Sequence, residues 1–257
     1  MDSDTRRLLA EYAQKYETAN FLCGDPSWFM HQVEGDANRE ATAFVASCLS
    51  FGSRSQFMSR IRWIVERANG NVDKWIRRGG FERDLPSNCR NCFYRFFTVA
   101  DMNNFLRVYR SLMEDAGTLG EYVEKAGGTE GLSAVKTICG TFASNNETLV
   151  VPKDAKSACK RVCMFLRWMV RDGSPVDLGI WSGFIDRRTL IIPLDTHVVQ
   201  EAGRLGIAEC HSASMSAARR LTATLAEVFP DDPLKGDFAL FGYGVDADRQ
   251  RRESPRG

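Results

Sequence analysis

No apolar run in the 257-residue sequence approaches the length of a membrane span. The N-terminal residues Met-Asp-Ser-Asp-Thr-Arg-Arg also lack the apolar core of a secretory signal. These absences predict a soluble, intracellular protein of the cytoplasm with no membrane partner. Alternation of apolar and polar residues over a useful length is missing too, as are internal repeats and low-complexity tracts. The sequence therefore predicts an all-α protein.

An excess of charge of one sign is also missing. The sequence has 34 Lys and Arg residues against 33 Asp and Glu residues, which gives a formal net charge of +1. Such a balance does not mark a nucleic-acid-binding protein, but binding requires only a local basic face. With 44% hydrophobic residues, the chain can fold as one large domain or as two small lobes that share a cleft.

The cysteines lack the grouping of a metal site. Cys89-Arg-Asn-Cys92 has the spacing of a zinc knuckle, but neither a second pair nor a histidine cluster completes it. Unpaired thiols are the favoured interpretation, and we predict no metal and no other cofactor. Reduced thiols are also expected because the chain is too large to need disulfides. The eight cysteines are scattered at positions 23, 48, 89, 92, 139, 159, 163 and 210.

Helical spacing of apolar residues recurs along most of the chain. It predicts helices at 4–18, 36–52, 53–68, 101–114, 119–126 and 132–142, with a turn-rich connection at 79–92. The helix at 53–68 carries arginines at positions 54, 60, 62 and 67 beside its apolar stripe. A solvated basic face is the favoured interpretation, and a DNA contact is the alternative. The charged residues 249–257 have no apolar anchors, which predicts a disordered tail after a domain of residues 1–248.

The segment from Leu190 to Gly206 combines a helix start with a carboxylate. An apolar run ends at Pro193, Asp195 follows in an N-cap position, and Gly206 ends the helix. Unpaired backbone N–H groups and the positive end of the dipole keep a carboxylate ionised there, and the same helix end can face a phosphate. On spacing alone, a capping role is the favoured interpretation of Asp195.

Residues 152–171 form the most basic window of the chain. A turn at 152–157 leads into a helix that starts near Lys160 and buries an apolar stripe. Backbone N–H groups of the turn, beside this charge, would suit a phosphate, although a bare charge run is usually solvated. The basic residues of the window are Lys153, Lys156, Lys160, Arg161, Arg167 and Arg171.

The segment Leu194-Asp-Thr-His-Val198, followed by Arg-Leu-Gly, resembles the signature of the helix-hairpin-helix DNA glycosylases. In that family a Val-Asp-Thr-His-Val segment carries the catalytic aspartate, and a hairpin followed by a helix that begins with lysine precedes it. The resemblance implies a two-lobed, all-α glycosylase fold with a cleft between the lobes, and a hairpin and catalytic segment at about residues 150–206. Asp195 matches the family's aspartate and Lys160 its lysine, and Lys156 stays open as the alternative.

The usual Leu-Pro-Gly-Val-Gly hairpin is absent, and the sequence from Val151 to Ala158 stands in its place. The connection from Lys160 to Asp195 is also longer than in the commonest members. Both departures resemble the archaeal 8-oxoguanine glycosylase branch. The C-terminal four-cysteine cluster that some members use for iron and sulfur is missing. Over about residues 20 to 245 the chain also resembles an uncharacterised bacterial family, which brings no activity with it.

The segment Asp237-Phe-Ala-Leu-Phe-Gly-Tyr-Gly244 is similar to the branch's late Asp-x-x-Leu-Trp-x-x-Gly motif. There the aspartate and the aromatic residue help hold the flipped base, and Phe241 replaces the tryptophan here. A core helix with Phe238, Leu240 and Phe241 buried and Asp237 exposed is the alternative.

The resemblance implies a monomeric base-excision repair enzyme that acts on damaged double-stranded DNA, with 8-oxoguanine as the preferred base. Lys160 would attack C1′ and form a Schiff base, giving abasic-site lyase activity, while Asp195 would stabilise the developing positive charge. Thr196 and His197 are expected to support the helix start. The expected base-pocket residues are Trp28, Trp168, Asp237 and Phe241, and the expected phosphate contacts are Lys153, Lys156 and Arg161.

Two other functions stay open. One is a DNA-binding protein on the same fold, in which Lys160 touches a phosphate and Asp195 is only a cap. The other is a glycosylase for a different lesion, or for a nucleic acid other than duplex DNA.

Overall fold

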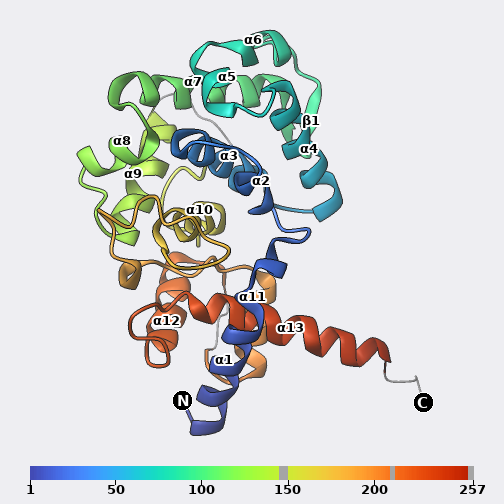
Figure 1. Ribbon diagram of the computed structural model, residues 1–257, viewed down its shortest axis with the longest axis vertical. Coiled ribbons are helices and arrows are strands. Elements are labelled where there is room, and N and C mark those ends of the chain that lie inside the picture. The colour runs from blue at the N-terminus through green and yellow to red at the C-terminus, as the bar shows by residue number, and fades with distance from the viewer. Residues whose placement is uncertain (145–149, 209–211, 254–257) are drawn as a thin grey trace.

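The computed structural model describes residues 1–144, 150–208 and 212–253 and is mostly helical (Figure 1), as the sequence predicts. The helices are α1 (Ser3–Tyr16), α2 (Trp28–His31), α3 (Asp36–Leu49), α4 (Arg54–Arg67), α5 (Val72–Arg77), α6 (Gly80–Asp84), α7 (Val99–Ala116), α8 (Leu119–Lys125), α9 (Gly131–Ser144), α10 (Lys160–Val170), α11 (Thr196–Arg204), α12 (Met215–Ala226) and α13 (Lys235–Glu253). Two short 3₁₀ helices, η1 (Ala19–Leu22) and η2 (Arg187–Thr189), lie between them. None of the helices in the described ranges is long and apolar enough to cross a membrane.

A short antiparallel hairpin departs from the helical pattern. Its strands are β1 (Cys92–Tyr94) and β2 (Phe97–Thr98), with Tyr94 opposite Phe97. The rings of Phe93, Tyr94 and Phe97 are buried, and they anchor the hairpin to the protein. Strands this short show no detectable alternation in the sequence, so the segment was expected only as the end of a turn-rich connection.

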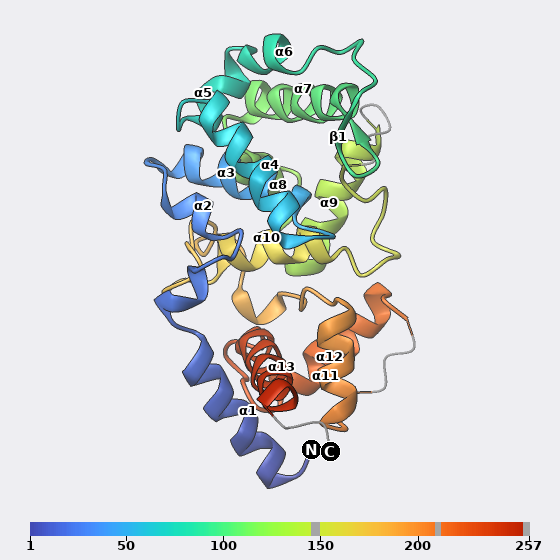
Figure 2. The same cartoon turned by 90° about the vertical axis from the view of Figure 1, so that its right-hand side faces the viewer.

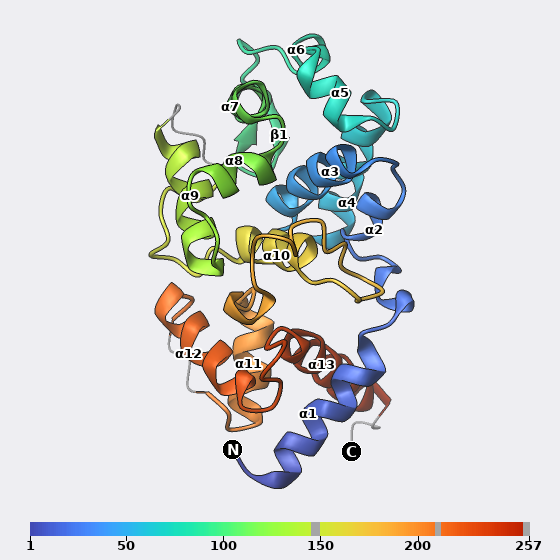
Figure 3. The same cartoon turned by 60° about the vertical axis from the view of Figure 1, so that its left-hand side comes forward.

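The helices form two groups, one above the other in Figures 1 and 3. The upper group contains α2–α9 and the hairpin, and the lower group contains α1, α11, α12 and α13; α10 lies between them. Helix α3 is buried along most of its length in the upper group. Its Phe44 ring lies 5.0 to 5.6 Å from the rings of Phe105, Tyr109, Phe142 and Phe165. Because Phe165 belongs to α10, this aromatic cluster fixes α10 to the upper group.

Helices α1 and α13 pack together in the lower group, although they lie at opposite ends of the chain (Figure 2). A Cβ atom at Gly242 would lie 2.1 Å from the Tyr16 ring, so only glycine permits this approach. Lys15 Nζ lies 2.5 Å from the Asp246 carboxylate in the last part of the contact. These contacts hold α13 against α1.

The prediction of a disordered tail at residues 249–257 is partly wrong. Helix α13 continues to Glu253, so residues 249–253 are helical, and residues 254–257 lie outside the described residues. The physical reason is that arginine, glutamine and glutamate are good helix formers, and extending an existing helix costs much less than starting one.

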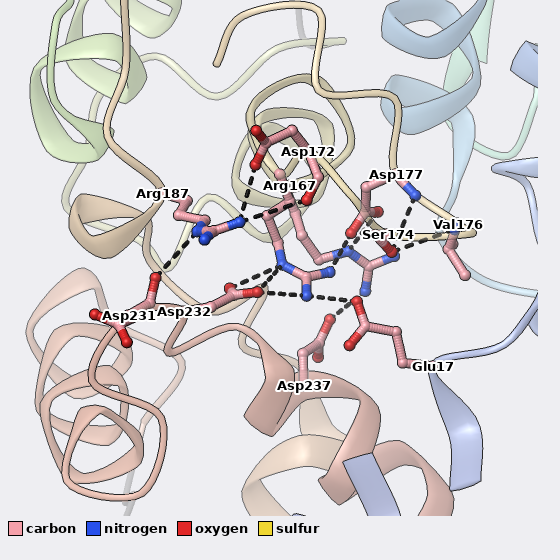
Figure 4. Close-up of polar contacts among 11 residues, drawn as sticks. Glu17, Arg167, Asp172, Ser174, Val176, Asp177, Arg187, Asp231, Asp232 and Asp237 are labelled. Atoms are coloured by element: carbon pink, nitrogen blue, oxygen red, sulfur yellow. Dashed lines mark hydrogen bonds and ion pairs between the residues drawn. The ribbon is translucent and has the colours of Figure 1, made fainter. Parts of the chain in front are cut away.

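Buried arginines on α10 join the two groups through carboxylates that Figure 4 shows turned toward them. Arg171 binds Asp232 through Nε and Nη2, at 2.9 and 2.7 Å, and Glu17 through Nη2 at 2.6 Å. Glu17 follows α1 and Asp232 precedes α13. The Asp177 side chain, which is fully buried, binds Nη1 of Arg171 and lies 3.2 Å from Nε of Arg167. Burial raises the pKa of Asp177, although both arginines oppose that shift.

Candidate functional site

Lys160 is the first residue of α10, and the loop before it sets its position. In residues 150–159, the N–H of Ala158 donates to the carbonyl of Ala213, 3.0 Å away, on the segment that precedes α12. Cys159 then has a φ of +47°, a left-handed conformation that is uncommon for a residue with a side chain. The chain turns sharply there into α10, which places Lys160 at the edge of the lower group.

Asp195 caps α11, as its sequence position predicts. Its Oδ1 accepts a hydrogen bond from the N–H of Val198, 2.9 Å away. Its Oδ2 lies 3.0 Å from Nζ of Lys160, which brings the two predicted catalytic residues into direct contact. Burial alone would raise the pKa of Asp195, but the charge of Lys160 and the Val198 N–H outweigh burial and lower it. Asp195 is therefore held as a carboxylate beside an amine.

A cavity of about 120 Å³ lies beside this pair. It forms where the starts of α4, α10 and α11 meet η1 and the first half of α13. The side chains of Lys160 and Asp195 are 36% and 31% exposed, so a ligand can reach both. A nucleophilic nitrogen and a proton-accepting carboxylate therefore face the same space. The lining residues are Phe21, Asp25, Arg54, Lys160, Met164, Arg167, Pro193, Asp195, His197, Val198, Asp237 and Phe241.

Asp237 lines the cavity from α13 and is only 8% exposed. Its Oδ2 accepts a hydrogen bond of 2.5 Å from Nη1 of Arg167. Burial raises the pKa of Asp237, and the guanidinium of Arg167 acts in the opposite direction. The alternative interpretation, a core helix with Asp237 exposed, is thus wrong for Asp237, although Phe238 and Leu240 are buried as it predicts.

Phe241, one of the residues predicted for the base pocket, lines the cavity within a cluster of rings. Its centroid lies 4.9 Å from that of Phe21, 6.3 Å from that of Tyr16 and 6.5 Å from that of His197. A Cβ atom at Gly244 would lie 2.3 Å from Nε2 of His197, so the glycine lets this imidazole pack against α13. His197 therefore lines the cavity and also joins α11 to α13.

Trp168 and Trp28, both predicted for the base pocket, do not line the cavity. The Trp168 side chain is fully buried because the loop after α10 covers it; the N–H of Leu178 donates to the carbonyl of Trp168 at 2.7 Å. Trp28 lies on α2, edge-on to Phe29 and beneath the guanidinium of Arg62. Helical spacing shows that a residue is amphipathic or apolar, but it does not show which loop covers it, so the sequence could not indicate that Trp168 is buried away from the cavity.

The predicted phosphate contacts separate into two kinds. Lys153 and Lys156 are exposed on the loop before α10, and Nζ of Lys156 lies 3.7 Å from Asp154 with its side chain 91% exposed. Neither lysine lines the cavity. Arg161 instead points into the upper group, donates to the carbonyl of Cys48 at 2.6 Å and covers the Phe51 ring at 5.0 Å. Burial lowers the pKa of Arg161. Its guanidinium supports the fold beneath the start of α10.

Sequence reasoning missed several lining residues, including Phe21, Asp25 and Met164. Phe21 and Asp25 precede α2, in a segment for which the sequence predicts no helix. Arg54 was noted solely as part of a basic helix. The proline of the 190–206 segment, Pro193, was placed only as the end of an apolar run, and it also lines the cavity. Their contribution depends on contacts between distant parts of the chain.

The cysteines of the described residues, which exclude Cys210, are free thiols. Cys92 donates from Sγ to the carbonyl of Arg95 at 3.1 Å, inside the hairpin. Sγ of Cys139 lies 3.9 Å from that of Cys159, beneath the turn that starts α10. Within the described ranges, no group of cysteine, histidine and acidic side chains has the arrangement of a metal site.

The chain belongs to a family described as "Protein of unknown function (DUF2400)", whose model matches residues 25–246. The matched region contains the cavity except for Phe21. No curated protein and no solved structure matches the chain.

Proposed function

We propose that the protein is a two-lobed helix-hairpin-helix DNA glycosylase with abasic-site lyase activity, in which the upper and lower groups are the lobes. The observation that carries this proposal is the contact of 3.0 Å between Lys160 and Asp195 beside a cavity that both groups line. Base removal through a Schiff base requires such a pairing of amine and carboxylate. The loop of residues 150–159, between α9 and α10, takes the position of the family's hairpin.

The reaction starts with the damaged nucleotide rotated out of the stack and its base in the cavity. Lys160 first gives up its ammonium proton to solvent. The free amine then forms a bond to C1′ while the bond from C1′ to the base breaks, and the base leaves with that electron pair and takes up a proton. Asp195 stabilises the positive charge that develops at C1′ and accepts the proton that the new C1′–N bond makes acidic. Opening of the sugar ring gives a Schiff base. Loss of a C2′ proton then breaks the C3′–O bond and releases the downstream strand with a 5′ phosphate, and water hydrolyses the Schiff base to free Lys160.

Asp237 is the cavity group that best suits recognition of the base. Its Oδ2 is bound to Arg167, and within the described residues no hydrogen bond is found to Oδ1. A purine can donate an N–H to this oxygen while Phe241 covers its ring, and 8-oxoguanine presents such donors. The cavity of about 120 Å³ is smaller than the roughly 300–1,000 Å³ of sites that enclose drug-sized ligands. We therefore expect it to hold the base alone, with the sugar at the Lys160 side.

Borohydride trapping tests this chemistry directly, because reduction of the Schiff base links the protein to DNA irreversibly. Duplexes would carry 8-oxoguanine or an abasic site. We expect a covalent adduct with the wild type and with Lys156→Gln, and none with Lys160→Gln. Lys156→Gln is a matched control because it lies only four residues away on the same basic segment and does not line the cavity. Asp195→Asn should trap slowly on the abasic site and release no 8-oxoguanine.

Two experimental outcomes would change the proposed function. Release of a base other than 8-oxoguanine from a panel of damaged oligonucleotides, with the same Lys160 adduct, would make the protein a glycosylase for that lesion. Absence of any adduct or base release, with DNA still bound and binding only modestly weakened by Lys160→Gln, would refute the enzyme and leave a DNA-binding protein.

A further inference from the structure

Phe96, at the turn between β1 and β2, is 61% exposed. Within the described part of the chain, the other large hydrophobic residues that are exposed are Met1 and Val245. The Phe96 ring is not loose, because its centroid lies 4.7 Å from that of Phe97 and 5.3 Å from that of Phe51. An aromatic side chain that is held in place yet open to solvent is suited to contact with a partner.

A groove of about 510 Å³ runs beside Phe96, between α4 and the hairpin. Hydroxyl, amide and guanidinium groups dominate its α4 side, and the guanidinium of Arg60 lies 5.3 Å from the Phe93 ring centroid. These groups can all donate hydrogen bonds to an anion. The groove is lined by Ser55, Gln56, Ser59, Arg60, Cys92, Phe93, Tyr94 and Arg95.

The positive charge on this face is not compensated. Arg54, Arg60 and Arg95 form no ion pair with the acidic side chains in the described ranges, whereas surface arginines such as Arg6 and Arg110 do. Helix α4 contains no acidic residue before its last turn. The N-cap side chain, that of Ser53, also makes no capping hydrogen bond, so the positive end of the helix dipole adds to the charge. The complementary partner is therefore a polyanion.

The groove and the candidate site both include residues from the N-terminal half of α4. Tyr94 donates from its hydroxyl to the carbonyl of Phe51, which ties the hairpin to the segment before α4. The Phe51 ring lies beneath Arg161, next in sequence to Lys160. Arg54, at the start of α4, lines the cavity together with Lys160. Arg54 and Ser55 are adjacent on α4 and line the cavity and the groove respectively, so a polymer that lies in the groove can extend toward the cavity.

We propose that the hairpin and the N-terminal half of α4 hold a strand of the DNA substrate, with Arg60 and Arg95 on its phosphates and Phe96 stacked on a base. This inference rests on the proposed function for its choice of DNA as the polyanion. Stacking on Phe96 is independent of sequence because every base has an aromatic face. Placed beside the cavity, the ring can cover a base next to the rotated nucleotide and stabilise the opened stack.

Fluorescence anisotropy with labelled duplexes, one undamaged and one with a stable abasic-site analogue, tests the proposal. Phe96→Ala should weaken binding about tenfold, and Phe96→Trp should retain it, because a stacked base contributes about that factor. Bound DNA should also quench the added emission of Phe96→Trp. The double variant Arg60→Gln with Arg95→Gln should lower the slope of log K against log salt by about 1.8, whichever duplex is used. Arg78→Gln is the control, an exposed arginine at the end of α5 with no acidic partner among the described residues.

The outcomes separate this inference from the proposed function. If trapping depends on Lys160 but Phe96→Ala and the double arginine variant bind DNA as tightly as the wild type, the DNA-binding role of the groove is refuted. The proposed enzymatic activity is then unaffected. Binding that depends on Phe96 and the arginines, without base release, would support the groove and refute the enzyme. Failure of the wild type to bind any duplex would overturn both, whereas self-association that Phe96→Ala abolishes would overturn the groove alone.

Discussion

Replacing Arg171 by methionine should destabilise the protein strongly, because it removes the centre of the buried ion cluster. Arg171 is 1% exposed and binds Asp232, Asp177 and Glu17. Without it, Asp177 retains only Arg167, at 3.2 Å, and is still fully buried. Breaking a buried pair by removing one partner costs about 3–5 kcal/mol. Since whole domains are stable by about 5–15 kcal/mol, this loss is a large share of the total.

The loss should depend on pH in a defined direction. Burial already raises the folded-state pKa of Asp177, and the variant lacks one of the two arginines that oppose the shift. A carboxyl whose folded pKa exceeds its unfolded pKa favours folding below the unfolded value, and this contribution is lost as pH rises through the folded value. The destabilisation of Arg171→Met should therefore be smaller at pH 5 than at pH 7.5.

Urea unfolding followed by tryptophan fluorescence measures both effects. Arg188→Met is the control, because Arg188 pairs with Asp186 at 2.5 Å with side chains 63% and 40% exposed. Such an exposed pair contributes little to stability because solvent screens it. The double variant Arg171→Met with Asp177→Asn should recover part of the lost stability, since it also removes the unpaired charge. A loss for Arg171→Met no larger than that of the control, or equal at both pH values, would refute the reasoning.

Two further predictions concern stability. Burial raises the pKa of Glu40 to about 7, although Trp181 Nε1 and the N–H groups of Leu119 and Gly120 donate to it. The contribution of Glu40 to the free energy of unfolding should thus decline as pH rises from about 4.5 to 7. Glu40→Gln, which has one acceptor oxygen fewer, should cost about 1–3 kcal/mol and cost less at pH 8 than at pH 5 in urea titrations. Gly242→Ala should lower the melting temperature because its Cβ would lie 2.1 Å from a tyrosine ring. Gly140→Ala is the control and should raise the melting temperature, because the added Cβ lies in open space on α9. Equal shifts in the two variants would contradict the α1–α13 packing.

The features that local sequence determines were predicted correctly. Asp195 caps α11 because an N-cap depends on a few adjacent residues. The start of α10 at Lys160 follows equally from a turn and an apolar stripe. A resemblance to an uncharacterised bacterial family was expected over about residues 20 to 245, and a family model of unknown function matches residues 25–246.

The features that long-range contacts determine could not be predicted. Arg167 and Arg171 look like part of a solvated or DNA-binding charge run, yet both are buried. The partner Glu17 is separated from Arg171 by 154 residues, and no local pattern indicates that contact. Trp168 was misassigned for the same reason, because the loop that covers it follows later in the chain. A charged residue is therefore expected at the protein surface, unless the fold places a carboxylate beside it in the interior.

Helix α10 carries both the candidate nucleophile and the arginines that join the two groups. Arg167 follows Lys160 by seven residues, close to two turns of the helix, so the two share one side, and Arg171 is the residue at the C-terminal end of α10. The upper group positions Lys160 through α10, while Asp195 belongs to α11 of the lower group. The distance between the two catalytic candidates therefore depends on how the groups dock. Because Arg171 binds residues at the end of α1 and before α13, the buried ion cluster sets that docking, and it reaches the site through Arg167, which lines the cavity.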